Sequence, residues 1–158
     1  MSKKILIVYY SWSGNTEKIA EIIQKSTSGV LFEIEPITAY PKSYNQTVEQ
    51  AKQEIRENFL PKLKSTISAM EYDIIFIGSP NWWSTIAPPV SSFLSNNNFS
   101  EKTVIPFFSH GGGGIAQLET DTAKLCEGSA IFKPFVAYDN GGSSLELEVN
   151  VWLKSLNI

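Results

Sequence analysis

The segment from Ser11 to Thr16 concentrates hydrogen-bonding groups at a point where a strand should pass into a helix. Ser11, Ser13, Asn15 and Thr16 surround Gly14, an apolar run precedes them, and a helical pattern begins at Thr16. The first N–H groups of a helix lack partners inside the helix and carry the positive end of its dipole. Such a corner binds a phosphate through hydroxyls and backbone N–H groups.

Residues 11 to 16 contain no lysine or arginine, and the Walker sequence G-x-x-x-x-G-K-[ST] is absent. Triphosphate chemistry is therefore not expected, and the corner predicts a site that anchors a terminal phosphate. The alternative is a simple helix start with Ser13 or Asn15 as N-cap and Glu17 in the first turn. A cap needs only one such residue, so the density of polar groups favours the phosphate site.

A second segment, Ser79-Pro80-Asn81-Trp82-Trp83, follows the apolar run of residues 72–77. Indoles stack well on flat aromatic ligands. Adjacent residues of a strand face opposite sides, so both tryptophans cannot point into the core. We predict that Trp82 contacts a ligand ring and that Trp83 packs beneath the loop. The alternative is that both belong to the core.

The third segment follows the apolar run of residues 104–108 and consists of Ser109, His110, Gly111, Gly112 and Gly113, with a further glycine after them. Glycines let backbone N–H groups approach a ligand closely. The only histidine, His110, has two possible roles. It either ties the backbone of its own loop or donates a hydrogen bond or proton to a ligand.

Other interpretations of these segments are weaker. Gly111, Gly113 and Ala116 fit the dinucleotide fingerprint G-x-G-x-x-A, but a glycine run satisfies it trivially and the chain lacks a second half for a six-stranded domain. No G-x-S-x-G elbow supports a hydrolase. A receiver domain would need an aspartate where Ser79 stands.

The surrounding pattern predicts how these segments are held. Continuous apolar runs at 5–10, 72–77, 104–108 and 130–138 indicate parallel strands buried on both faces, whereas the alternating run 30–36 indicates an edge strand that Pro36 ends. Helical patterns cover 16–25, 43–59, 88–94, 115–125 and 143–156. We predict one α/β domain over residues 1–158, a doubly wound three-layer sandwich with a five-stranded parallel sheet. Ligands bind such sheets at the carboxyl ends of the strands.

Two of these motifs resemble a known family. Ser-x-Ser-Gly-Asn-Thr after the first strand is similar to the flavodoxin phosphate loop, Thr/Ser-x-Thr/Ser-Gly-x-Thr, and Gly-Ser-Pro-x-Trp-Trp at residues 78–83 resembles a bacterial flavodoxin-like subgroup. The resemblance implies the strand order 2-1-3-4-5 and FMN as cofactor. It assigns the phosphate to Ser11, Trp12 (through its backbone), Ser13, Gly14, Asn15 and Thr16, and the ring to the segments Ser79–Trp83 and Ser109–Gly113.

The same resemblance implies a flavoprotein that acts in electron transfer with a redox partner protein or a small acceptor such as a quinone. The alternative is an FMN-dependent NAD(P)H:quinone-type oxidoreductase. The net charge is only −3, and residues 79–90 and 109–116 contain no Asp or Glu. We therefore predict a reduction potential less negative than that of the strongly acidic flavodoxins.

The composition of the chain argues against several other classes of protein. A net charge of −3 gives no reason to expect a nucleic-acid partner, and no apolar stretch is long enough to span a membrane. The N-terminal apolar run is too short for a signal peptide, so we expect a cytoplasmic protein. The single cysteine, Cys126, excludes an internal disulfide and a multi-cysteine metal site, and we expect it to be a buried helix residue. Oligomeric state is left open.

Overall fold

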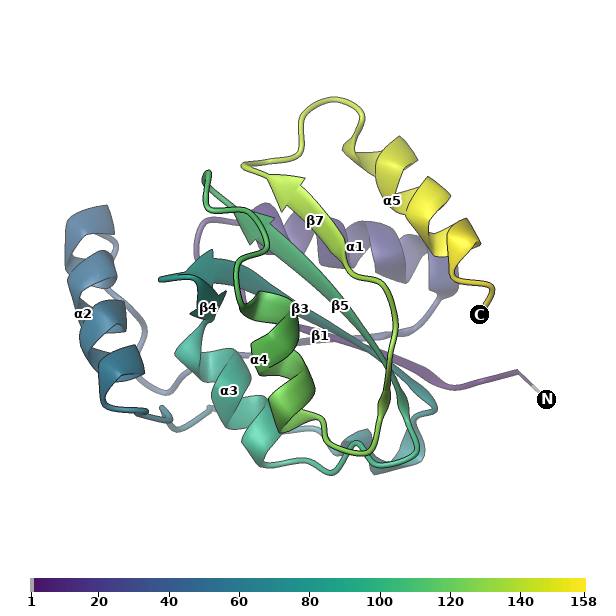
Figure 1. Ribbon diagram of the computed structural model, residues 1–158, viewed down its shortest axis with the longest axis horizontal. Coiled ribbons are helices and arrows are strands. Elements are labelled where there is room, and N and C mark those ends of the chain that lie inside the picture. Colours follow the sequence, from purple (N-terminus) through teal and green to yellow (C-terminus); the bar gives the residue numbers. More distant parts are fainter. Residues whose placement is uncertain (1) are drawn as a thin grey trace.

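The computed structural model describes residues 2–158 and shows a sheet between two layers of helices (Figure 1). The strands are β1 (Ile5–Tyr9), β2 (Val30–Glu33), β3 (Ile74–Trp82), β4 (Thr85–Ile86), β5 (Thr103–His110), β6 (Ala130–Ile131) and β7 (Phe135–Tyr138). The parallel order is β2-β1-β3-β5-β6, with β7 also paired to β5. The predicted fold class and strand order are therefore confirmed.

The last predicted strand, 130–138, is interrupted. Its first part, β6, pairs with the start of β5, and its second part, β7, pairs with the end of β5. Pro134 lies between them and has no N–H to donate to the ladder, which accounts for the break. The short strand β4 was not predicted, and it pairs with the end of β3 as an antiparallel hairpin.

The helices lie close to the predicted ranges: α1 (Asn15–Thr27), α2 (Tyr44–Arg56), α3 (Pro88–Ser95), α4 (Leu118–Leu125) and α5 (Leu145–Ser155), with a 3-10 turn η1 (Ala69–Glu71) before β3. Helices α1 and α5 cover one face of the sheet, and α3 and α4 cover the other (Figure 1). No helix within residues 2–158 is long and apolar enough to cross a membrane.

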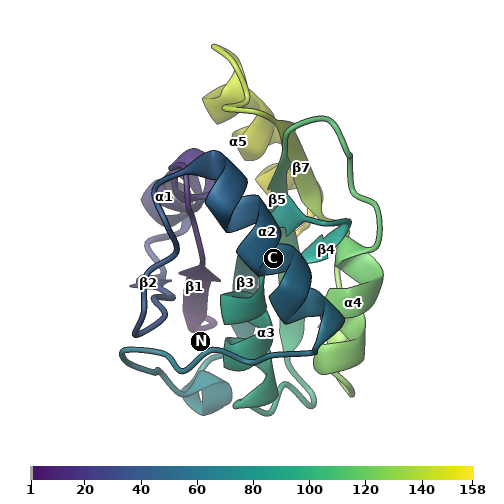
Figure 2. The ribbon, with the colours of Figure 1, turned by 90° about the vertical axis from the view of Figure 1, so that its left-hand side faces the viewer.

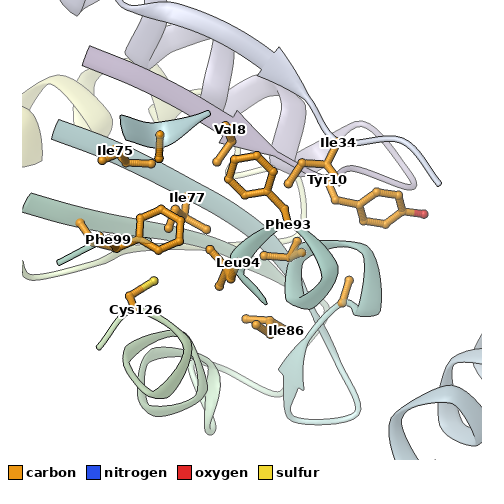
Figure 3. Close-up of a cluster of buried hydrophobic side chains, with 14 of the residues drawn as sticks. Val8, Tyr10, Ile34, Ile75, Ile77, Ile86, Phe93, Leu94, Phe99 and Cys126 are labelled. Carbon is orange, nitrogen blue, oxygen red and sulfur yellow. The ribbon is translucent and has the colours of Figure 1, made fainter. Parts of the chain in front are cut away.

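Each face of the sheet carries its own apolar cluster. Along β3, Ile75 and Ile77 belong to the cluster beneath α3 and α4, whereas Phe76 between them belongs to the cluster beneath α1 and α5. This alternation explains why the strand reads as one continuous apolar run. Figure 3 shows the first cluster, where Phe93 of α3 packs among these strand residues. Cys126 is buried as expected, but it directly follows α4 instead of lying within a helix.

Helix α2 covers neither face of the sheet. It crosses the carboxyl ends of the strands, in front of the sheet when the molecule is viewed along them (Figure 2). The Ser43 hydroxyl caps its first turn by accepting the N–H of Gln46 at 3.4 Å. The predicted helix reached Phe59, but the observed helix ends at Arg56 and Phe59 is exposed. Helix α2 therefore lies at the end of the molecule where the three predicted ligand loops begin.

Close strand packing brings the loops together at this end. Gly78 of β3 faces Phe107 of β5, and a Cβ atom at position 78 would collide with the Phe107 ring. Only glycine lets the two strands keep this approach. The loops that follow β3 and β5 thus start side by side.

Candidate functional site: a cleft at the carboxyl ends of the strands

A cleft of about 530 Å³ lies where the three predicted loops meet, beneath α2. The predicted residues that line it are Trp12, Ser13, Asn15, Pro80, Asn81, Trp82, Trp83, Ser109, His110 and Gly111. The other predicted residues, Ser11, Gly14, Thr16, Ser79, Gly112 and Gly113, support the loops without lining this cleft. The fold therefore brings together predicted residues that lie between Trp12 and Gly111 in the sequence.

The first loop turns sharply into α1. Gly14 has φ 98° and ψ −7°, a left-handed conformation that favours glycine. The Ser11 Oγ accepts the N–H groups of Gly14 at 3.1 Å and of Glu17 at 3.2 Å. The helix start is thus held by Ser11, and the alternative in which Ser13 or Asn15 caps the helix is wrong.

This arrangement leaves hydrogen-bond donors available. Within residues 2–158, the backbone N–H groups of Trp12, Ser13, Asn15 and Thr16 have no acceptor. The Ser13 hydroxyl and the Asn15 amide both line the cleft, and the side-chain hydrogen bonds of this loop among the described residues are made by Ser11, Trp12 and Thr16. Four N–H groups, one hydroxyl and one amide beside a helix N-terminus match the acceptor oxygens of a phosphate. The donor set fits a phosphate bound without a basic side chain.

Thr16 lies below this loop instead of facing the cleft. Its Oγ1 is 2.8 Å from Ser109 Oγ, and both side chains are buried. The contact joins the start of α1 to the end of β5. The Thr16 hydroxyl therefore links the first and third loops.

The two tryptophans are packed differently, and the expectation that Trp83 packs beneath the loop is wrong. Which of the two indoles contacts a ligand ring stays a prediction. Trp82 packs edge-on against Tyr10 at 5.4 Å and Tyr40 at 5.0 Å between ring centroids, next to the core. Trp83 is 47% exposed. The reason is that Trp82 pairs with Thr85 as the last strand residue, so Trp83 enters the hairpin turn. Both indoles still line the cleft.

The turn itself is unusual. Trp83 has φ 55° and Ser84 φ 70°, both positive as a two-residue type I′ hairpin requires, although glycine and asparagine normally fill such turns. Trp83 Nε1 donates to the backbone oxygen of Val48 at 2.9 Å, and Lys52 Nζ lies 5.2 Å from the ring centroid. These contacts with α2 offset the strain and fix the indole at the cleft.

Asn81 connects the second and third loops. Its Nδ2 donates to the Gly114 oxygen at 2.9 Å, and its Oδ1 accepts the Ser84 N–H at 2.9 Å. Ser79 is fully buried, where its Oγ accepts the N–H of Ala87 at 2.9 Å. Both residues therefore hold the second loop in shape, and Asn81 also lines the cleft.

His110 shapes the glycine loop. Its Nδ1 accepts the N–H groups of Gly112 at 3.0 Å and Gly114 at 3.1 Å, so the structural role considered for this residue is present. In the neutral ring the proton then resides on Nε2, which leaves one ring donor for a ligand. The ring packs edge-on against Tyr138, with 5.5 Å between centroids.

Sequence reasoning missed part of the lining: Tyr44, Thr47, Val48, Ala51 and Asp139. The first four belong to α2, a helix that the sequence predicted but gave no reason to place at the cleft. Asp139 directly follows β7, and its N–H donates to the His110 oxygen at 2.7 Å. Its position after a parallel strand was a usable signal, because such positions meet at the ligand-binding edge. Asp139 is the acidic residue among those that line the cleft.

The fold and the cleft define an α/β protein whose parallel sheet carries a phosphate-type donor loop beside an aromatic wall. The family model described as Flavodoxin matches residues 4–155, and the chain belongs to the flavodoxin family. The resemblance predicted from the two loop motifs is thereby confirmed.

Solved structures of similar proteins cover nearly the whole chain. A Bacteroides eggerthii protein provisionally called a flavoprotein is 26% identical, with a TM-score of 0.85 and coverage of 99% of both chains. A Lactobacillus acidophilus flavoprotein, solved in complex with FMN, is 29% identical, with a TM-score of 0.73 and coverage of 96% of this chain and 99% of its own. Oxidised flavodoxin 2 of Bacillus cereus shares the fold at 21% identity and a TM-score of 0.54, with coverage of 96% and 99%. A search of curated proteins found no significant match.

Proposed function

We propose that this protein is an FMN-binding flavoprotein that acts in electron transfer. The observation that carries the proposal is the set of unpartnered donors at residues 12, 13, 15 and 16, which lies at one end of an aromatic-lined cleft. A flavoprotein that is 29% identical to this chain, aligned over nearly its whole length, was solved with FMN.

The residues divide into two groups by the part of FMN that they would hold. The phosphate takes hydrogen bonds from the backbone of Trp12 and Thr16 and from backbone and side chain of Ser13 and Asn15. The ring lies between the second and third loops, where the indoles offer apolar surface and His110 Nε2–H offers a donor. Bound FMN supplies the one- and two-electron chemistry, and the protein supplies position and electrostatics.

Exposed aromatic side chains near the cleft suit an electron carrier. Trp83 is 47% exposed, and Tyr138, which packs on His110, is 66% exposed. A flavin edge between them would be accessible to a redox partner protein or to a small acceptor such as a quinone. The few charges there argue against a strongly basic docking partner.

The second candidate is an FMN-dependent NAD(P)H:quinone-type oxidoreductase. The same exposed aromatic surfaces favour it, because flat rings such as Trp83 also stack on a small aromatic acceptor. The two functions differ in whether the protein alone accepts a hydride from a nicotinamide.

Steady-state kinetics with the purified FMN-loaded protein separates them. We expect no NADH or NADPH oxidation above that of free FMN when a quinone is supplied. We also expect rapid electron transfer from the chemically reduced protein to the quinone. Turnover well above the free-FMN control would instead establish the reductase. Failure of the reduced protein to reduce any acceptor would overturn the carrier proposal.

A further inference from the structure

The glycine loop at residues 111–114 has little packing to hold it. A Cβ atom at Gly111, Gly112 or Gly114 would meet no atom of the described residues within 4 Å. Glycine also loses more conformational entropy on ordering than any other residue. The conformation of this loop therefore depends on its hydrogen bonds.

His110 makes most of these hydrogen bonds. Its Nδ1 accepts the N–H groups of Gly112 at 3.0 Å and Gly114 at 3.1 Å. The other side-chain bond to the loop among the described residues runs from Asn81 Nδ2 to the Gly114 oxygen at 2.9 Å. The backbone N–H groups of the loop are therefore tied to one ring nitrogen.

The His110 ring is held in turn by β7, which lies beside β5 (Figure 1). It packs edge-on against Tyr138, with 5.5 Å between ring centroids, and the backbone oxygen of His110 accepts the Asp139 N–H at 2.7 Å. The ring is thus fixed to the sheet, and the loop is fixed to the ring.

The acceptor in this arrangement is titratable. Nδ1 accepts hydrogen bonds only while it carries no proton, and in the charged ring both nitrogens are donors. An added proton would therefore face two N–H groups. Imidazole side chains ordinarily titrate near about pH 6.5, and His110 is partly exposed to solvent.

The neighbouring titratable groups do not change charge in the same range. Tyr138 packs on the ring, and Asp139 lines the same cleft. Tyrosine ordinarily titrates near about pH 10 and aspartate near about pH 4. Residues 79–90 and 109–116, which form the second and third loops, contain no Asp or Glu. His110 is therefore the group whose charge changes near neutral pH at this end of the cleft.

We propose that His110 is a positioning residue that works as a pH-dependent latch. Its unprotonated Nδ1 holds the glycine loop in the observed conformation, and protonation of Nδ1 releases the loop. Because Gly111 lines the cleft, release alters one wall of the cleft and weakens the binding of a flavin ring as the pH falls. This consequence for binding rests on the proposed function, whereas the latch itself does not.

NMR titration of the nitrogen-15-labelled apoprotein from about pH 8 to about pH 5 tests the latch. His110 is the only histidine, so its ring signals are unambiguous. We expect the ring proton on Nε2 at the alkaline end, and we expect the Gly112 and Gly114 amide signals to share the titration midpoint of the ring. Gly142, whose N–H donates to Asn140 Oδ1 at 2.8 Å, is the internal control and should not follow that titration. A ring proton on Nδ1 at the alkaline end, or glycine amides that do not follow the ring, would overturn the latch.

Riboflavin binding tests the consequence for the cleft. Riboflavin replaces FMN here because a phosphate monoester itself titrates near about pH 6. The dissociation constant should rise about threefold to thirtyfold from about pH 8 to about pH 5, because the loop loses two hydrogen bonds. His110→Asn keeps an acceptor oxygen that does not titrate, and it should remove this pH dependence.

The outcomes distinguish the latch from the function to which it is linked. Equal riboflavin affinity at both ends of the pH range, or the same pH dependence in His110→Asn, would overturn the control of the cleft by His110. Glycine amides that follow the ring in a protein that binds neither riboflavin nor FMN would contradict the proposed function and leave the latch intact.

Discussion

Thr16 Oγ1 and Ser109 Oγ lie 2.8 Å apart inside the protein, and this contact joins the first turn of α1 to the end of β5. Thr16 lies in the proposed phosphate loop, and Ser109 begins the glycine loop that His110 shapes. A buried hydroxyl pair is stable only when both partners are present. This contact therefore helps to fix the position of the first loop relative to the third.

Breaking the pair should cost stability in a non-additive way. Thr16→Val leaves the Ser109 hydroxyl buried without its partner, and the expected loss is about 1–3 kcal/mol in the free energy of unfolding. Ser109→Ala should cost a similar amount. The double variant should cost less than the sum by at least about 0.5 kcal/mol, as measured by urea denaturation. Strict additivity would show that the two hydroxyls do not interact.

Two adjacent tryptophans should respond differently to truncation. Trp82→Ala removes a ring packed on Tyr10 and Tyr40 and should destabilise the protein by about 3 kcal/mol. Trp83→Ala removes one hydrogen bond to α2 and the contacts of a half-exposed ring, so its cost should be below about 1.5 kcal/mol. It should nevertheless weaken FMN binding about threefold to tenfold.

Thermal denaturation and FMN titration of both variants check this prediction. Trp82→Phe is the control that keeps an aromatic ring in the cluster, and it should retain most of the stability. A larger loss of stability for Trp83→Ala than for Trp82→Ala would contradict the assignment of Trp82 to the packed position.

Asp139 should tune the reduction potential of the bound flavin. A carboxylate that lines the cleft makes a reduced, anionic flavin more costly. Asp139→Asn should therefore shift the two-electron potential to less negative values by about 20–40 mV. Spectroelectrochemical titration measures the shift, with Glu127→Gln as the distant charge control.

The reduction potential of the wild-type protein tests whether the low number of acidic residues around the cleft matters. With few acidic residues near the flavin, we expect a potential less negative than that of strongly acidic flavodoxins. A potential as low as theirs would contradict this expectation. An unchanged or lower potential in Asp139→Asn would exclude Asp139 as a contributor.

Cys126 should make stability fall at alkaline pH. Burial raises the pKa of its thiol from 9.0 to about 12. In the unfolded chain the thiol ionises above pH 9, whereas in the folded protein it stays neutral until about pH 12. The contribution of Cys126 to the free energy of unfolding is therefore complete below pH 9 and is lost between pH 9 and pH 12. Burial also raises the pKa of Tyr9, Tyr10 and Tyr40, which adds a loss of the same sign at higher pH.

Replacing Cys126 separates the effect of its thiol on alkaline stability from that of the tyrosines. Cys126→Ala should reduce the slope of unfolding free energy against pH by up to about 1.4 kcal/mol per pH unit in this window. Urea denaturation at several pH values from about 8 to 11 provides the slopes. Parallel slopes in the two proteins would show that Cys126 is not protected from ionisation in the folded state.

The fold was predictable from the sequence because its strands are apolar on both faces and so read as unbroken runs. Ile75, Phe76 and Ile77 each enter one of the two cores, and no polar interruption obscures the strand. The division of the last strand at Pro134 followed from proline chemistry, but the run around it concealed the break. Hairpin strand β4 has only two residues and left no periodic signal.

The cleft residues could be predicted where a loop directly follows a strand. The prediction failed where tertiary packing decides which residues face the cleft. Val48 and Ala51 have the same spacing as core-facing residues, and only the position of α2 across the strand ends turns them toward the cleft. The roles of Trp82 and Trp83 depended on where the hairpin turn begins, which is set by one pairing with Thr85. Side-chain contacts of Ser11, Thr16 and Ser79 could not be read from the loop sequence.

Titration of the apoprotein with FMN and riboflavin, in the wild type and in Ser13→Ala, tests the central claim most directly. We expect one FMN per chain with a dissociation constant below about 1 µM. Ser13→Ala should weaken FMN binding by about tenfold to a hundredfold, because it removes a hydrogen bond of about 1.5–3 kcal/mol to a charged phosphate. Riboflavin, which lacks the phosphate, should bind both proteins equally. No FMN binding at about 10 µM, or equal weakening of both ligands, would contradict a phosphate site in the first loop.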